Sequence, residues 1–244
     1  MLEVKNITGG YANIPVLHDV DFKVRDGELV GLIGLNGAGK STTIKEIIGL
    51  LSPYKGEILI DGQGINEDMA TYRKKIGFIP ETPSLYEELT LKEHIELVMM
   101  AYDLEAESAW SRVQELLAIF RLEDRLDWFP MNFSKGMKQK VMIICALMVE
   151  PSLLIVDEPF LGLDPIAIAD LINLLNQAKA QGSSILMSTH VLDSAEKMCD
   201  RFVILHKGRV KATGNLTDLR QEFAMQDASL NEIYLSLTQE GGQG

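Results

Sequence analysis

The sequence is poor in features that define several classes of protein. Its two cysteines, Cys145 and Cys199, fit neither a metal-binding motif nor a disulfide framework, and both lie in apolar helical patterns typical of core positions. Basic residues are scarce, since 23 lysines and arginines stand against 35 acidic residues, for a net charge of −12. Because nucleic acids favour clustered basic residues, this balance argues against a nucleic-acid partner.

Long apolar runs are also missing. The longest uninterrupted run extends from Val141 to Val149, far short of the roughly 20 residues that cross a bilayer. The first residues, Met1 to Lys5, have neither the basic start nor the apolar stretch of a signal peptide, so a reducing cytoplasm is the expected compartment. The chain of 244 residues is long enough for one large domain, or for one domain with an inserted subdomain.

The most informative segment that is present runs from Gly34 to Thr42. It fits G-x-x-x-x-G-K-[ST], the phosphate-binding P-loop, and follows the apolar run 29–33 as a P-loop follows its strand. Glycines let the backbone N–H groups turn around an anion, and the positive end of the following helix dipole adds to the attraction. The residues expected to bind nucleotide are Gly34, Leu35, Asn36, Gly37, Ala38, Gly39, Lys40, Ser41 and Thr42.

The order of sequence patterns predicts an α/β fold with a P-loop NTPase core. Alternating residues near the start indicate an N-terminal antiparallel β-subdomain, and helical periodicity between residues 83 and 150 indicates an inserted α-helical subdomain. Strands then alternate with helices, as in a parallel sheet. We expect residues 1–82 and 151–214 to form the nucleotide-binding core, 83–150 the helical subdomain, and 215–244 a C-terminal helical segment with a frayed glycine-rich end.

Three residues at strand ends are the candidates for catalysis. Asp157 and Glu158 follow the apolar run 153–156, and His190 ends the next predicted strand. Ligands of open α/β sheets bind at the carboxyl ends of the strands. Asp157 is therefore expected to hold Mg²⁺, and Glu158 to act as the general base that activates water.

Together these motifs resemble those of the ATP-binding subunit of ABC transporters over nearly the whole chain. They occur in the family's order: an adenine-stacking aromatic at Tyr11, Walker A at 34–42, the Q-loop at Glu81, the signature segment at 132–139, Walker B at 153–158, the D-loop at 161–165 with Asp164, and the H-loop at 189–190. The fold class predicted above is then of the ABC ATPase type.

The resemblance implies a cycle of ATP binding and hydrolysis in a head-to-tail homodimer. The signature of one subunit would contact the nucleotide of the other through Ser134, Lys135, Gly136 and Met137. ATP and Mg²⁺ are the implied cofactors, with Ser41, Glu81 and Asp157 near the metal and Glu158 and His190 catalytic. The implied partner is a separate polytopic transmembrane permease, which would hold the subunit peripherally on the inner face of the cell membrane.

Two departures from the commonest family pattern point to a subgroup of the family. Glu81 replaces the usual Gln of the Q-loop, and the signature has Lys135 and Met137 where Gly and Gln are most familiar. This pairing is similar to that of ABC-2-type exporters. The segments 80–90, 128–130, 133–140, 157–165 and 227–230 resemble those of the Ecs-type exporter ATPases of Gram-positive bacteria.

Two alternatives stay open. A soluble ABC ATPase with a mechanical or regulatory role is disfavoured, because only 93 residues separate Lys40 from Ser134 and they contain no sustained heptads. An importer ATPase is also disfavoured, because the stretch after Gly214 is too short for the regulatory β-domain that importers often add.

Overall fold

Alternating apolar and polar residues at the start of the chain form an antiparallel sheet. The computed structural model describes residues 1–240. In it this first sheet has the strand order β2-β1-β4-β5. The strands are β1 (Leu2–Tyr11), β2 (Ile14–Val24), β4 (Lys55–Ile60) and β5 (Gln63–Gly64). Leu2, Val4 and Ile7 are buried and alternate with more exposed residues, so one face of the sheet packs against the core. The predicted N-terminal antiparallel β-subdomain is confirmed.

The second sheet contains six strands in the order β10-β9-β3-β8-β7-β6. Five are parallel: β3 (Leu29–Ile33), β6 (Ile76–Ile79), β7 (Leu153–Asp157), β8 (Ser184–Thr189) and β9 (Arg201–His206). Two of them, β3 and β7, match the apolar runs 29–33 and 153–156 to within one residue. The sixth, β10 (Arg209–Gly214), is an antiparallel edge strand that the sequence analysis did not predict.

The strand β7 is buried on both faces, as its continuous apolar run predicts. Leu153 and Ile155 face the antiparallel sheet and belong to the core between the two sheets. Leu154 and Val156 face the opposite way, into the core beneath the helices. The apolar run ends at Asp157, the last residue of the strand, which therefore lies at the carboxyl edge of the sheet.

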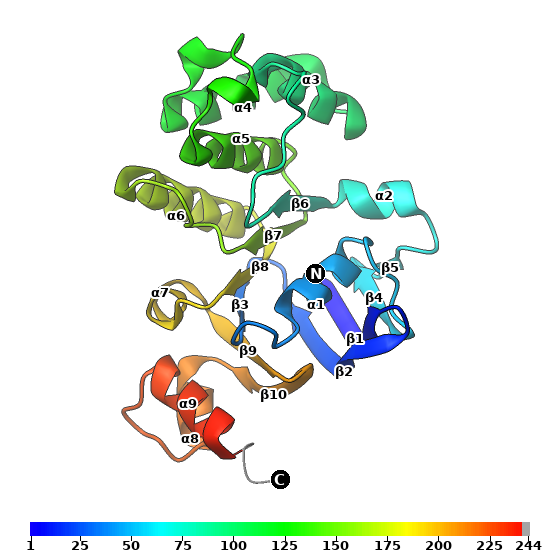
Figure 1. The fold of residues 1–244 in the computed structure, drawn as a ribbon, viewed down its shortest axis with the longest axis vertical. Coiled ribbons are helices and arrows are strands. Elements are labelled where there is room, and N and C mark those ends of the chain that lie inside the picture. The colour runs from blue at the N-terminus through cyan, green and yellow to red at the C-terminus, as the bar shows by residue number, and fades with distance from the viewer. Residues whose placement is uncertain (241–244) are drawn as a thin grey trace.

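Most of the middle of the chain is helical and forms one end of the molecule (Figure 1). It contains α3 (Leu91–Ala101), α4 (Ala106–Phe120), α5 (Lys135–Leu147) and the short 3₁₀ turns η1 (Glu123–Arg125) and η2 (Pro130–Asn132). A capping box begins α3, because the Thr90 side chain accepts from Glu93 N–H and the Glu93 side chain accepts from Thr90 N–H.

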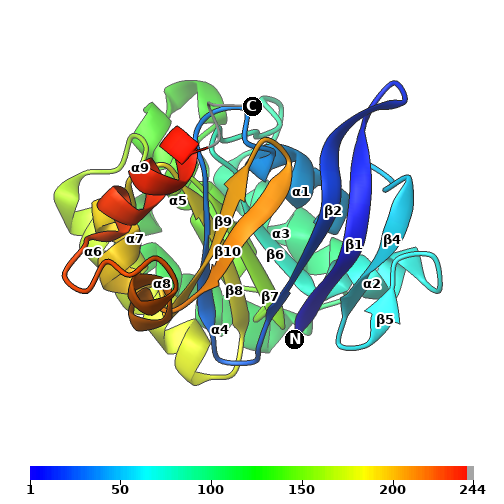
Figure 2. The ribbon, with the colours of Figure 1, turned by 90° about the horizontal axis from the view of Figure 1, so that it is seen from below.

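The remaining helices surround the parallel sheet. They are α1 (Lys40–Ile47), α2 (Met69–Lys74), α6 (Pro165–Ala180), α7 (Leu192–Met198), α8 (Leu216–Glu222) and α9 (Leu230–Glu240). The short helix α2 was not predicted. Helices α8 and α9 confirm the C-terminal helical segment and lie at the end of the molecule opposite α3 and α4 (Figures 1 and 2). The expected frayed end, 241–244, lies outside the described residues, and the subdomain boundaries given above stay a prediction.

Both cysteines pack as small core residues, as predicted. Cys145 lies against the core beneath the helices, and Cys199 lies between that core and the one under α8 and α9. Burial raises the pKa of the Cys145 thiol to about 12 and also raises the pKa of Cys199. Protonated thiols of this kind are poor nucleophiles, so neither cysteine is a candidate for covalent chemistry.

Candidate functional site

The P-loop connects the end of β3 to the start of α1 and lines a cavity of about 300 Å³. Gly37 and Gly39 have φ values of +81° and +113°, a backbone region that L side chains rarely adopt, so these two positions favour glycine. The lining residues are Val16, Leu35, Asn36, Gly37, Gly39, Lys40, Ser41 and Thr42. All but Val16 belong to the predicted nucleotide-binding segment.

The hairpin between β9 and β10 is hydrogen-bonded to the P-loop. Gly208 N–H donates to the carbonyl of Ala38 at 2.9 Å, and the Gly208 carbonyl accepts from His18 N–H at 2.8 Å. A Cβ at position 208 would overlap the carbonyl oxygen of Val16, so the hairpin tip approaches β2 as closely as a backbone can. Gly208 thus joins the P-loop to the antiparallel sheet.

Lys40 lies against the backbone of its own loop. Its Nζ donates to the Gly34 carbonyl at 2.7 Å and to the Leu35 carbonyl at 3.5 Å. Burial lowers the pKa of Lys40, while the nearby carboxylates Glu158, Asp157 and Glu81 oppose that shift. The lysine therefore lies close to the carboxylates at the strand ends.

The three residues expected near a metal ion line one cavity of about 430 Å³. Ser41 comes from α1, Glu81 from the segment after β6, and Asp157 from the end of β7. Asp157 accepts a hydrogen bond from the Ser188 hydroxyl. The pKa of Asp157 is raised, mainly by burial and further by the negative charge of Glu81. The hydrogen bond from Ser188 and the positive charge of Lys40 act in the opposite direction without cancelling the shift. A hydroxyl and two carboxylates are hard oxygen donors of the kind that suit Mg²⁺.

Glu158 is turned toward the end of the neighbouring strand β8. Its φ is +45°, an uncommon value for a residue with a side chain, and its N–H donates to the Ser188 carbonyl at 3.0 Å. The Thr189 hydroxyl donates to Glu158 Oε2 at 3.2 Å, and His190 Nδ1 lies 2.7 Å from Glu158 Oε1. The glutamate side chain is 11% exposed and the histidine 53%. The left-handed turn thus pairs the two residues predicted to be catalytic.

The signature segment lies against the D-loop and away from the P-loop of the same chain. Ser134 caps α5, accepting from Met137 N–H at 3.2 Å, and Asp164 caps α6 with Pro165 in its first turn. A Cβ at Gly136 would overlap the Gly162 carbonyl, so signature and D-loop are in backbone contact. The cavities lined by the P-loop and by Asp157 include none of the predicted signature residues, Ser134, Lys135, Gly136 and Met137.

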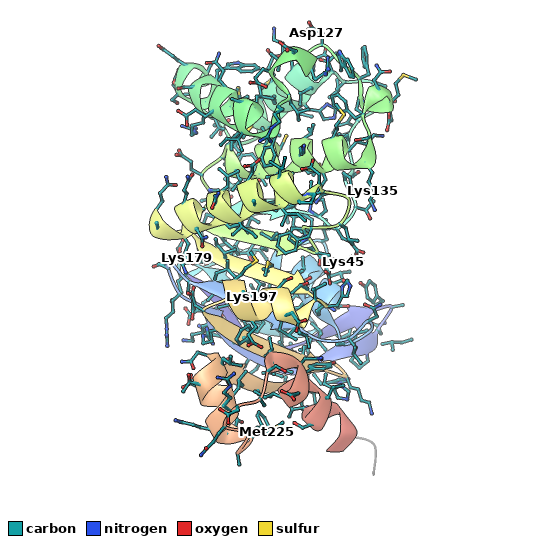
Figure 3. The ribbon with its side chains drawn as sticks, turned by 90° about the vertical axis from the view of Figure 1, so that its left-hand side faces the viewer. Lys45, Asp127, Lys135, Lys179, Lys197 and Met225 are labelled. Atoms are coloured by element: carbon teal, nitrogen blue, oxygen red, sulfur yellow. The ribbon has the colours of Figure 1, made fainter. Side chains whose placement is uncertain are left out.

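The predicted adenine aromatic, Tyr11, lies half-exposed at the end of β1. Lys45 of α1 contacts it, with Nζ 3.3 Å from the hydroxyl and 5.5 Å from the ring centroid. Figure 3 shows Lys45 and Lys135 on the same side of the molecule. The P-loop helix and the signature helix therefore both reach that side.

Several residues around the site were not predicted. Lys45 lies five residues after Lys40 on the P-loop helix, outside the motif. Ser188 and the C-terminal Tyr234, whose hydroxyl accepts from Leu35 N–H at 2.9 Å, carry no sequence motif either. Among residues 1–240, no helix combines the length and apolar character that crossing a membrane requires. In the same range, no cluster of three His, Cys, Asp or Glu side chains is arranged to hold a metal ion.

A P-loop on a parallel sheet, a paired carboxylate and histidine at the strand ends, and a capped signature helix define an ATPase of the cassette type. The family model described as "ABC transporter" matches residues 17–161. The chain belongs to the ABC transporter family, as the ATP-binding subunit, and it is an ATP hydrolase.

Individual relatives agree with this assignment. The chain is 57% identical over 240 residues to the ABC-type transporter ATP-binding protein EcsA of Bacillus subtilis (strain 168), covering 98% of this chain and 97% of that protein. It is 35% identical over 213 residues to the Nod factor export ATP-binding protein I of Rhizobium meliloti (strain 1021), covering 87% of this chain and 64% of that protein. The resemblance to Ecs-type ATPases is confirmed.

Two solved structures are similar over most of their length. One, of the ATP-binding subunit of an ABC transporter, has a TM-score of 0.96 and 57% identity, with 98% of this chain and 99% of that chain covered. The other is a dimeric ATP-binding cassette in a post-hydrolysis state bound to ADP and Pi. It has a TM-score of 0.79 and 29% identity, with 88% of this chain and 99% of that chain covered.

Proposed function

We propose that two copies of this subunit close head-to-tail on ATP and Mg²⁺ and power export through a separate polytopic transmembrane permease. The observation that carries the proposal is the separation of the site into two groups of residues within one chain. One group surrounds the P-loop, whereas the signature helix packs on the D-loop and lines neither cavity. A second copy, inverted, would bring the missing group to each nucleotide.

In this proposal the P-loop binds the phosphates and Lys40 changes partners. The lysine would leave the Gly34 carbonyl and reach the β- and γ-phosphates, exchanging a neutral acceptor for a charged one. Backbone N–H groups of residues 36–42 and the dipole of α1 would hold the remaining charge. Tyr11, steadied by Lys45, would stack on the adenine.

The carboxylates at the strand ends would divide the chemistry between them. Mg²⁺, held by Ser41 and Asp157 with Glu81 nearby, would neutralise charge on the phosphate oxygens during transfer. Glu158 would accept the proton of the attacking water, and His190 would orient that carboxylate. Because an ionised carboxylate only accepts hydrogen bonds, His190 Nδ1 would be the donor in this pair.

The signature group would complete the site from the second copy. Ser134 and the N–H groups near Gly136 lie at the start of α5, where the helix dipole favours an anion. Lys135 adds a positive charge there, and Met137 stands where a polar Gln is most familiar. Asp164, the cap of α6, would hold the adjoining D-loop in shape.

The membrane partner would dock on the segment from Glu81 to Thr90. Within it, Tyr86 is 63% exposed, although its N–H is fixed by a hydrogen bond to His94 Nε2 at 2.9 Å. Such a rigid backbone with an exposed aromatic side chain suits capture of a helix from the permease. Docking there would place the subunit at the inner face of the membrane. The direction of transport is inferred from the ABC-2-like motifs and from the name of the Nod factor export relative.

A pull-down tests the proposal. The Glu158→Gln variant, tagged in its own host, is purified from gently solubilised membranes with ATP and Mg²⁺, with Lys40→Ala as the matched control that should not close. A multi-span membrane protein at one-to-one stoichiometry supports the proposal, and vesicles containing both proteins then show whether cargo leaves or enters. Recovery with soluble proteins alone supports the soluble ABC ATPase instead, and inward cargo movement supports the importer.

A further inference from the structure

The C-terminal helix α9 is anchored beside the nucleotide site. Leu230 N–H donates to Glu196 Oε2 of α7 at 2.7 Å, and α7 begins two residues after His190. Leu230, Ile233 and Tyr234 are buried in one cluster with Ile33, the last residue of the strand that leads into the P-loop. The helix α9 therefore packs against the helix that follows the H-loop and shares a core cluster with the last residue of the P-loop strand.

One peptide unit connects α9 to Lys40. The N–H of Leu35 donates to the Tyr234 hydroxyl at 2.9 Å, and the carbonyl of the same peptide, that of Gly34, accepts from Lys40 Nζ at 2.7 Å. Tyr234 is 3% exposed. The cavity beside this bond, about 380 Å³ in volume, is lined by residues of the P-loop, the H-loop and α9, among them Leu35, His190 and Tyr234.

We propose that Tyr234 is a positioning residue for the P-loop, so that the C-terminal helix forms part of the nucleotide-binding machinery. The inference rests on the proposed binding of ATP phosphates at the P-loop. When Lys40 leaves the Gly34 carbonyl for a phosphate, the Gly34–Leu35 peptide loses one of the two hydrogen bonds that orient it. The bond to Tyr234 stays in place and keeps that peptide, and the loop beyond it, in the orientation that receives the anion. A loop ordered in advance binds more tightly, because binding then costs less conformational entropy.

The ring and the hydroxyl of Tyr234 have separable roles. The ring packs in the core cluster that includes residues of α7, α8 and α9, and the hydroxyl accepts the hydrogen bond from the P-loop. Tyr234→Phe therefore keeps the packing and removes the positioning bond. Tyr102→Phe is the matched control, because the Tyr102 hydroxyl also bonds the backbone, donating to the Ile76 carbonyl at 2.6 Å, outside the P-loop.

The experiment compares full-length wild type, Tyr234→Phe and Tyr102→Phe. We expect Tyr234→Phe to weaken binding of ATP by about three- to tenfold, the effect of one hydrogen bond. KM should rise by a similar factor while kcat stays within about twofold, because the bond acts on binding and not on the reacting atoms. The Tm without nucleotide should fall no further than in Tyr102→Phe.

Two results would overturn the inference. An unchanged Kd and KM in Tyr234→Phe would show that the hydroxyl does not position the loop. An equal loss of affinity in Tyr102→Phe would show that a lost hydrogen bond lowers affinity wherever it lies. Failure of the wild type itself to bind ATP would instead reject the proposed role of the P-loop, so the two failures are distinguishable.

Discussion

His190 Nδ1 lies 2.7 Å from Oε1 of Glu158, and the two residues come from the ends of adjacent strands. The Thr189 hydroxyl donates to the other carboxylate oxygen, so both oxygens of Glu158 are held. A carboxylate fixed in this way has one orientation in which to meet a water molecule. In the proposed mechanism Glu158 accepts the proton of water and His190 orients the Glu158 carboxylate. Substitutions at the two positions can distinguish these roles.

Glu158→Gln should abolish turnover while leaving ATP binding intact. The amide cannot take a proton from water, so we expect the hydrolysis rate to fall by about 10²- to 10⁴-fold. Single-turnover hydrolysis measured beside equilibrium ATP binding checks this. A variant that retains a normal rate would show that Glu158 is not the general base.

His190→Ala should lower kcat and leave ATP affinity within about twofold of wild type. Loss of an orienting group costs less than loss of the base itself, so we expect a fall of at least about tenfold in kcat. The measurement is a full substrate titration of both variants under identical conditions. If His190→Ala loses affinity and keeps its kcat, the histidine acts in nucleotide binding and not on Glu158.

A mixture of two inactive variants should recover activity. Lys40→Ala removes the main charge on the phosphates, and Gly136→Ala forces a side chain against the Gly162 carbonyl and displaces the signature helix. Each homodimer then lacks one half of both sites, whereas a mixed dimer has one complete site. ATPase assays of each protein alone and of the mixture test this. A mixture as inactive as its components would argue against sites shared between subunits.

Stability should decline as the pH rises through neutrality, because of Glu46 in α1. This side chain is 2% exposed, neither carboxylate oxygen has a hydrogen-bond partner among residues 1–240, and burial raises its pKa from 4.5 to about 7. The folded state thus favours the protonated acid. Its contribution to the free energy of unfolding is fully present below pH 4.5 and is lost as the pH passes 7, a change of about 3 kcal/mol.

Glu46→Leu should remove most of that pH dependence and raise the free energy of unfolding at pH 8. Urea unfolding at pH 6 and pH 8 measures both effects, with exposed Glu88→Gln as the control that should change neither. A Glu46→Leu protein that loses stability at pH 8, or keeps the wild-type slope, would mean that the buried carboxyl is compensated in the native state.

Tyr86→Ala combined with Leu89→Ala should weaken capture of the permease without changing ATP affinity. Both residues lie in the segment proposed to contact the membrane partner, and neither lines the nucleotide cavities. Tyr54→Ala, another partly exposed aromatic residue outside that segment, is the matched control. The measurement is the amount of permease that co-purifies with the wild type, with the double variant and with Tyr54→Ala. Equal capture of the permease by all three proteins would show that the segment from Glu81 to Thr90 is not part of the docking surface.

The core of the fold was readable from the sequence because its strands are buried on both faces. The run 153–156 has to lie between two layers, and the P-loop motif fixes β3 and α1 beside it. By contrast, β10 is half-exposed, and its hairpin turns at Lys207 and Gly208, both with positive φ, without the Asn-Gly or Asp-Gly that usually signals such a turn.

The site was predicted where motifs carry the chemistry and missed where tertiary contacts do. Asp157, Glu158 and His190 lie at strand ends, and strand order alone brings them together. Tyr234 lies 199 positions from Leu35, and the sequence around either residue does not predict the hydrogen bond between them. Glu46 occupies a position that looks like an ordinary helix surface, and its burial follows from close packing against Gly9 of β1.

The Gly208 hairpin tip carries a practical consequence. Surface hairpins are the usual places to splice in a reporter or to reopen a chain by circular permutation. Here the tip bonds Ala38 of the P-loop on one side and His18 of β2 on the other. A graft at this turn would separate the P-loop from the antiparallel sheet, so a tagged or permuted form of the protein should be opened elsewhere.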